Sequence, residues 1–160
     1  MKNFSRICKS LLASALLSSG PAFAALNLQF STELRTAQAQ AIATVAGTSP
    51  ILRVYNGTMP ANCAASITGT LLAQGTLPST PFATASSGAI SKTGTWTLTG
   101  QSGASASAGT HFRLWKSDGT TCVLQGTWGV GTYDMQPDVN SITNGQTVTI
   151  STFTITRGNQ

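Results

Sequence analysis

The sequence contains few charged residues, and acids are the scarcest of them. Of 160 residues, nine are Lys or Arg and four are Asp or Glu, so charged residues make up 8% of the chain, against about a quarter in an ordinary soluble domain. Disordered tails combine high charge with low hydrophobicity, and coiled coils need abundant Glu, Lys, Arg and Leu. The composition therefore excludes both classes and leaves few ionisable side chains for an active site.

Residues for acid–base or metal chemistry are also scarce. The one histidine, His111, lies in a predicted strand, whereas a nucleophilic triad needs a base oriented by an acid. Asp118 is expected to form a turn and not to serve as a catalytic carboxylate. Asp134 and Asp138, with Asn140, form either a small oxygen-rich cation site or a solvated loop, and their spacing is not that of an EF-hand. No Cys-x-x-Cys motif is present. We therefore expect no enzyme activity, no cofactor and no metal site.

The first 24 residues have the organisation of a secretory signal peptide. Basic residues precede a short apolar run, Leu11–Ser19, and small residues at the end of the segment predict cleavage after Ala24. The run is shorter than the roughly 20 residues that cross a bilayer, which argues against a membrane anchor. Cleavage leaves one exported domain, residues 25–160, in the periplasm or outside the cell. Translation from a start downstream of Met1 is the alternative.

Cys63 and Cys122 are the two cysteines that remain after such a cleavage. Thiols in an oxidising compartment usually pair. On the chain-entropy model, a bridge closing a loop of about 60 residues stabilises by roughly 4 kcal/mol. Two separately buried free cysteines are the alternative. The apparent signal peptide favours the disulfide.

One segment, at about residues 32–46, predicts a helix. Ser31 or Thr32 can cap its N-terminus, and Gly47 fits the position after its last turn. A helix of this length is marginal alone, so one face must dock on the rest of the domain. Spacings of three and four residues indicate the docking face: Leu34, Ala37, Ala41 and Val45.

Short β-strands are predicted for the rest of the chain. Their length and their Gly, Asn and Asp turns are typical of an antiparallel β-sandwich or a jelly-roll-like barrel of 6–8 strands. The fold class is therefore mostly β, with one N-terminal helix. The expected strands are Ile51–Tyr55, Thr70–Leu77, Thr93–Thr99, His111–Lys116, Thr121–Trp128 and Thr147–Thr156.

Local signals add detail to this outline. Asp118-Gly119 between two strands predicts a hairpin with a primed turn, in which both central residues have positive φ. The alternation in the last strand changes phase, which predicts a β-bulge near residues 151–152 or a crossing between sheets. Pro78–Lys92 and Gln101–Gly109 are rich in small and polar residues and are expected to be surface loops.

Arg113 and Lys116, with Trp115, are the nearest approach to a basic aromatic patch. Phosphate binding needs clustered basic residues, and the basic residues beyond position 24 are scattered from Arg35 to Arg157. We therefore expect no nucleic-acid binding. Trp115 has the strand parity of Arg113 and should lie on the outer face, where an exposed Trp is typical of a protein partner surface. The three residues form the predicted interaction surface.

Five segments follow one another in order from residue 26. They are LNLQFSTELRTAQAQAI, SPILRVYNGTMPANCAA, GTLLA, GTHFRLWKSDGTTCVLQGTWG and SITNGQTVTISTFTITRGN. The most specific parts are PANCAA and DGTTC, which hold the two cysteines. With this pattern the chain resembles a family of small β-rich proteins encoded among the virion structural genes of tailed phages and prophages. The resemblance implies a capsid decoration or tail protein with no catalytic residues.

The N-terminus departs from that family, whose members begin near Ala25 and are not exported. Either the domain is joined to a real signal peptide, or translation starts downstream. The first functional hypothesis is therefore a virion component that packs against copies of itself or a shell protein. The second is an exported binding module, a pilin-like or adhesin-like β-sandwich. The sequence does not identify a small-molecule ligand.

Intact mass spectrometry of the native product tests the N-terminal interpretation. We expect the mass of a chain that begins at Ala25, less two hydrogens for a Cys63–Cys122 disulfide. A mass that includes Met1, or two alkylatable thiols in the unreduced product, would contradict it.

Overall fold

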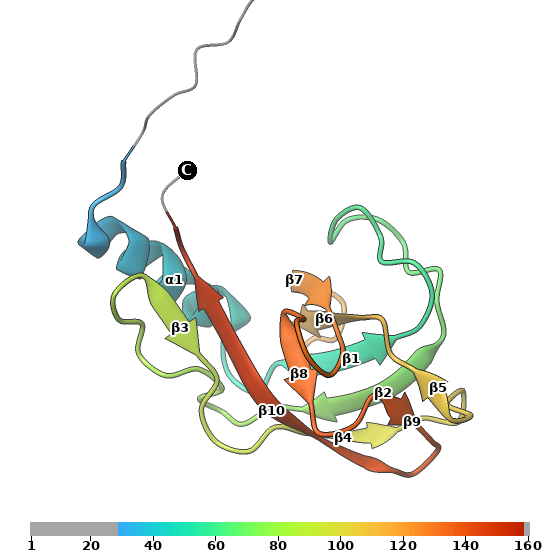
Figure 1. Cartoon of the computed structure of the whole chain (residues 1–160). Helices are drawn as coiled ribbons and strands as arrows, with labels where there is room; N and C mark the ends of the chain where they lie inside the picture. The colour runs from blue at the N-terminus through green and yellow to red at the C-terminus, as the bar shows by residue number, and fades with distance from the viewer. Residues whose placement is uncertain (1–28, 159–160) are drawn as a thin grey trace, which may run out of the picture.

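The computed structural model describes residues 29–158, so the expected signal peptide lies outside the described residues. One helix, α1 (Thr32–Ala46), packs beside a strongly curled antiparallel sheet (Figure 1). The mostly β fold with one N-terminal helix is thus confirmed. The strands are β1 (Ile51–Tyr55), β2 (Leu71–Thr76), β3 (Ala89–Ser91), β4 (Thr97–Gly100), β5 (Ser107–Ala108), β6 (His111–Trp115), β7 (Cys122–Thr127), β8 (Met135–Pro137), β9 (Ser141–Ile142) and β10 (Thr147–Thr156).

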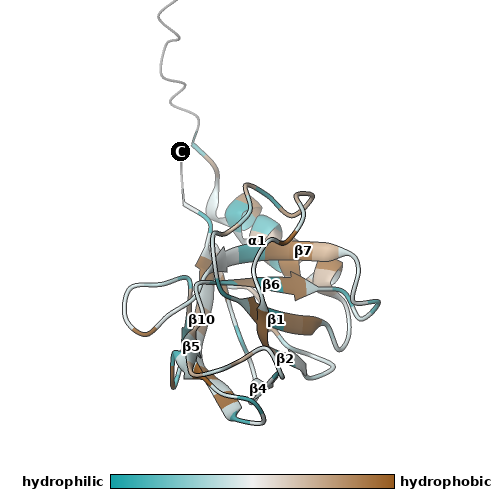
Figure 2. Cartoon of the chain, turned by 90° about the vertical axis from the view of Figure 1, so that its right-hand side faces the viewer, coloured by the Kyte–Doolittle hydropathy of each residue, from teal (hydrophilic) through white to brown (hydrophobic). Residues whose placement is uncertain are grey.

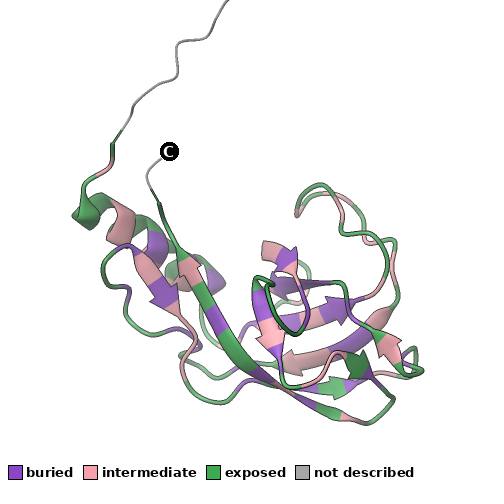
Figure 3. Cartoon of the chain, in the orientation of Figure 1, coloured by how far each residue is buried: buried purple, intermediate pink, exposed green. Residues whose placement is uncertain are grey.

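Eight of these strands form one sheet in the order β3-β10-β4-β2-β1-β6-β7, with β8 paired to β10. β5 and β9 form a separate ladder of two strands. Every ladder between the strands is antiparallel. Figure 2 shows hydrophobic residues on β1, β6 and β7, and Figure 3 shows buried and exposed positions alternating along β10.

An aromatic cluster fills the inside of the curl. The Phe153 ring centroid lies 5.5 Å from that of Phe112, 5.8 Å from that of Trp96 and 6.3 Å from that of Phe82. Trp96 and Leu98 are both buried on one face, as the alternation predicts. Edge-to-face packing of such rings adds to the stabilisation from their buried area.

The ends of α1 are as predicted, but its docking face is not. The Ser31 hydroxyl accepts the Leu34 N–H at 3.2 Å, and Gly47, with φ 70°, follows the last turn. The buried residues are Ala39, Ile42 and Ala46, whereas Leu34 and Val45 are 46% and 50% exposed. The predicted face of Leu34, Ala37, Ala41 and Val45 is therefore wrong.

Polar side chains explain the choice of the other face. The Gln40 side chain accepts the Ala85 N–H, and the Thr36 hydroxyl accepts the Gly88 N–H, each at 2.9 Å. Unpaired backbone amides in a buried position are costly. The side of α1 that carries Thr36 and Gln40 therefore faces the segment before β3. This orientation of the helix directs Ile42 into the core.

The β6–β7 hairpin is confirmed, but its turn is not a primed one. In the turn only Gly119, at φ 68°, has positive φ, and Asp118 does not. The Asp118 carboxylate accepts the N–H groups of Thr120 and Thr121 and the Thr121 hydroxyl. A side chain that accepts the N–H of the residue two positions later stabilises a turn of this kind, which is longer than the two-residue primed turn.

The bulge in β10 is confirmed. Pairing with β8 shifts register between Ile150 and Thr152. Val148, Ile150 and Phe153 are all buried on either side of this shift. The extra residue therefore lets both halves of the strand direct their apolar side chains into the core.

Three expectations for irregular segments need correction. Pro78–Lys92 is not a surface loop, because Phe82, Ala85 and Ile90 are buried and β3 lies within it. Gln101–Gly109 contains β5 and buries Ala104. The strand expected from Thr93 begins at Thr97, since the Trp96 indole N–H turns back to the Thr93 carbonyl. The short strands in these segments were not predicted, because their small residues give little hydrophobic alternation.

Substitutions in α1 test the docking face. Ile42→Ala is expected to lower the free energy of unfolding by about 2–4 kcal/mol, because it leaves a cavity in the core. Leu34→Ala, at an exposed position of the same helix, should change it by less than about 0.5 kcal/mol. Urea unfolding followed by circular dichroism measures both. Equal losses, or a larger loss for Leu34→Ala, would contradict this orientation of the helix.

Candidate interaction surface

Arg113 lies on the outer face of β6, but it is buried, at 2% exposure. Residues 56–70, which connect β1 to β2 and are called the β1–β2 loop here, cover it. Its Nη2 donates to the carbonyls of Asn62 at 2.9 Å and Ala65 at 2.8 Å, and its Nη1 donates to that of Cys63 at 3.4 Å. Its Nε donates to Gln125 Oε1 at 2.9 Å. These acceptors are all neutral, and we call them the Arg113 cradle.

The predicted surface of Trp115, Arg113 and Lys116 is therefore not a free patch. Arg113 is enclosed, and Trp115 and Lys116 are half-buried. The correct parity was predicted, since Arg113 and Trp115 both lie on the outer side of β6. What the sequence did not show is that the β1–β2 loop folds over this side.

Arg53 also belongs to this surface, although it was not predicted from the sequence. Arg53 pairs with Arg113 across β1 and β6, and the Trp115 ring lies 5.5 Å from the Arg53 guanidinium carbon and 5.7 Å from that of Arg113. Arg53 also donates to the side chain of Gln74 and to the Gly119 carbonyl. Guanidinium groups stack on aromatic faces, so the Trp ring helps two facing cations to coexist. The alternation of residues 51–55 could have placed Arg53 on this side.

The Cys63–Cys122 disulfide confirms the expected pairing and fixes the β1–β2 loop over the cradle. Its Cα atoms are 5.6 Å apart, and it joins the loop to the start of β7. Gln125 provides a second connection, because its amide nitrogen donates to the Pro60 carbonyl at 2.6 Å. The loop is thus held at Pro60 by Gln125, at Cys63 by the disulfide, and from residue 62 to residue 65 by Arg113.

His111 is fully buried at the start of β6 and stacks on Tyr55, with ring centroids 5.5 Å apart. Its Nδ1 lies 3.0 Å from the Thr110 hydroxyl, and its Nε2 has no hydrogen-bond partner within the described chain. Burial, and to a lesser extent the charge of Arg113, lowers the pKa of His111. The ring therefore stays neutral at neutral pH, in a packed environment.

Three aspartates each belong to a different turn or strand end. Hydrogen bonds from the Thr121 hydroxyl and from the amides of Thr121 and Thr120 hold the pKa of Asp118 well below its usual range. Asp134 accepts the Thr127 N–H and hydroxyl, and Asp138 accepts the Thr149 N–H.

Asp134, Asp138 and Asn140 thus do not converge on one point. In the part of the chain that the structure covers, no group of three or more His, Cys, Asp or Glu side chains is placed to hold a metal ion.

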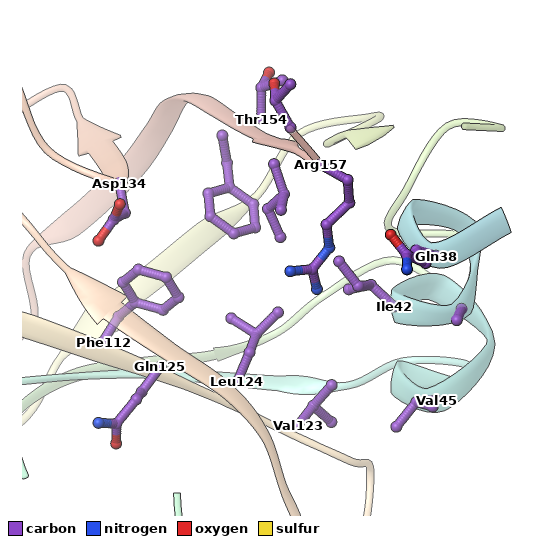
Figure 4. A pocket seen from close by; sticks show the side chains of 14 residues that line it. Gln38, Ile42, Val45, Phe112, Val123, Leu124, Gln125, Asp134, Thr154 and Arg157 are labelled. Carbon is purple, nitrogen blue, oxygen red and sulfur yellow. The ribbon is translucent and has the colours of Figure 1, made fainter. Parts of the chain in front are cut away.

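A groove of about 600 Å³ lies between α1, β7 and the end of β10 (Figure 4). Arg157 reaches into it beyond the end of β10, and Asp134 lies at the opposite side. This groove was not predicted, because the helical pattern placed the exposed side of α1 in the core. Apolar side chains form most of its lining: Ala41, Ile42, Val45, Phe112, Val123, Leu124, Phe153 and Ile155.

Comparisons of the chain with protein-family models, curated proteins and solved structures found no match. Between residues 29 and 158, no helix is long and apolar enough to cross a membrane.

Truncation of Arg113 tests the cradle. Arg113→Ala is expected to cost about 3 kcal/mol of unfolding free energy or more, because buried carbonyls lose their donor. Lys116→Ala, directly after the end of β6 and half-buried, serves as the control and should cost less than about 1 kcal/mol. Chemical unfolding under oxidising conditions keeps the disulfide intact in both variants. A cost for Arg113→Ala no greater than that of the control would show that the cradle does not hold the loop.

Proposed function

We propose that the protein is a non-enzymatic structural component that acts by packing against protein neighbours, as a capsid decoration or tail protein of a phage or prophage particle. The resemblance of the segments between Leu26 and Asn159 to virion structural proteins supports this role.

The observation that carries the proposal is the uncharged face of β10. This strand is the longest of the sheet and has no charged residue in the sequence TVTISTFTIT. Thr147, Ser151 and Thr152 are exposed on it. Charged residues are depleted at the centre of protein–protein interfaces, so such a strand suits packing against another protein.

Exposed large side chains support the same function. Val130, Met59 and Tyr133 are 61%, 40% and 47% exposed. Met and aromatic residues are enriched at protein interfaces relative to the rest of the surface. These side chains lie on loops between strands, where a neighbouring subunit has access to them.

An exported binding module is the second candidate function. The Cys63–Cys122 disulfide favours it, because disulfides persist in oxidising compartments such as the periplasm. The two functions differ in where the protein is found: a virion component accumulates in particles, and an exported module accumulates unassembled outside the cytoplasm.

Assembly tests the first function. We expect the protein to sediment with particles from producing cells, and the purified chain to associate with rising concentration in analytical ultracentrifugation. Thr147→Lys with Thr152→Lys places like charges on β10 and should weaken association at least tenfold. Thr48→Lys with Thr120→Lys adds the same charge at exposed positions off β10 and should have little effect. A monomer at all concentrations that is absent from particles would contradict the proposal, and recovery from the periplasm would favour the second function.

A further inference from the structure

The groove beside α1 marks a seam in the curled sheet. β7 ends the strand order, and its ladder partner is β6. On the other side of the groove, the last residues of β10, Thr154–Thr156, pair with β3. Both strands line the groove, so one edge of β7 faces one edge of β10 across it.

β8 closes only one end of this seam. It pairs with β10 at Ile150–Phe153, and Met135 forms a bridge to Trp128 just after β7. This closure ends at Asp134, whose carboxylate accepts a hydrogen bond from the Thr127 N–H. An unpaired edge next to apolar side chains readily accepts another strand. The edge of β7 from Val123 to Gln125 is therefore a position for an added strand.

The chain itself supplies a segment of suitable sequence. Residues 25–29 read Ala-Leu-Asn-Leu-Gln and are followed by Phe30. In an extended strand, Leu26, Leu28 and Phe30 lie on one face, and Asn27 and Gln29 on the other. This is the alternation of a half-buried strand.

The position of Phe30 brings that segment to the groove. Phe30 lines a hollow together with Gln38, Ala41, Thr156 and Arg157, and these four residues also line the groove. Five extended residues span about 17 Å. The distance along β10 from Arg157 back to Phe153 is about 13 Å at the usual rise of a strand. Residues 25–29 are thus long enough to follow the whole groove.

We propose that residues 25–29 of the same chain occupy this groove as an additional strand along the edge of β7, with Leu26 and Leu28 directed between Leu124 and Phe153. A segment that ends at Phe30 beside Thr156 runs parallel to β10. β8 is antiparallel to β10 and its bridge to Trp128 is parallel, so β7 is antiparallel to β10. The added strand therefore runs antiparallel to β7, as in the ladders between the other strands.

The short connection to α1 favours this occupant over a second molecule. A tethered segment has an effective concentration in the millimolar range, which a second copy in solution does not reach. This inference is independent of the proposed function, because it concerns the closure of the domain itself.

Hydrogen exchange of the full chain tests the inference at the amides of Val123 and Gln125. We expect these amides to exchange at least tenfold more slowly than in the variant Leu26→Asp with Leu28→Asp, since local pairing slows exchange. Asn27→Asp with Gln29→Asp introduces the same charge on the opposite face and should retain the protection. The central strand β1 serves as the reference, because Leu52 and Val54 must stay protected in every folded variant.

A second pair of variants leaves the N-terminal segment unchanged. Ala41→Asp puts a carboxylate into the groove, and Ala37→Asp puts one on the same helix at an exposed position away from it. Only Ala41→Asp should release Val123 and Gln125 to fast exchange. Equal exchange in the unaltered chain and in both N-terminal variants would overturn the proposal. Protection that disappears on dilution would also overturn it, because it would assign the groove to a second copy.

Discussion

The guanidinium of Arg113 holds the outer face of the sheet together. It donates to three carbonyls of the β1–β2 loop and to the Gln125 side chain. A buried cation needs all its donors satisfied, and here the β1–β2 loop provides most of the acceptors. The loop in turn is fixed to β7 by the Cys63–Cys122 disulfide. Arg113 and the disulfide therefore determine together what covers β6 and β7 on this side.

The shortage of acids explains why the acceptors are neutral. The chain has four Asp and Glu residues, and Asp118, Asp134 and Asp138 are hydrogen-bonded to backbone or threonine groups of their own turn or of a neighbouring strand. Buried cations therefore use carbonyls, amide side chains and an aromatic ring. Because charged residues make up 8% of the chain, few charges are left for the surface as well. The same composition thus accounts for the cradle inside and for the uncharged face of β10 outside.

Much of the backbone was predictable, because its signals are local. Capping residues mark α1, alternation marks β1 and β10, and two cysteines after an apparent signal peptide predict the disulfide. The burial of Arg113 was not predictable, since alternation gives the side of a strand but not what covers it. The docking face of α1 was missed for a related reason: Thr36 and Gln40 bind amides of the segment before β3, and a helical pattern does not show such distant partners. The groove lies beside the exposed side of α1, so it depends on this docking face and could not be found from the sequence.

The most direct test of the cradle is nuclear magnetic resonance of the arginine guanidinium protons. If Arg113 is enclosed by carbonyls, its Nη protons should give separate, slowly exchanging signals at neutral pH, because four hydrogen bonds restrict rotation and exclude water. Arg157 is exposed, so its Nη protons should give averaged signals and exchange fast with water. An Arg113 spectrum that cannot be distinguished from that of Arg157 would contradict the account.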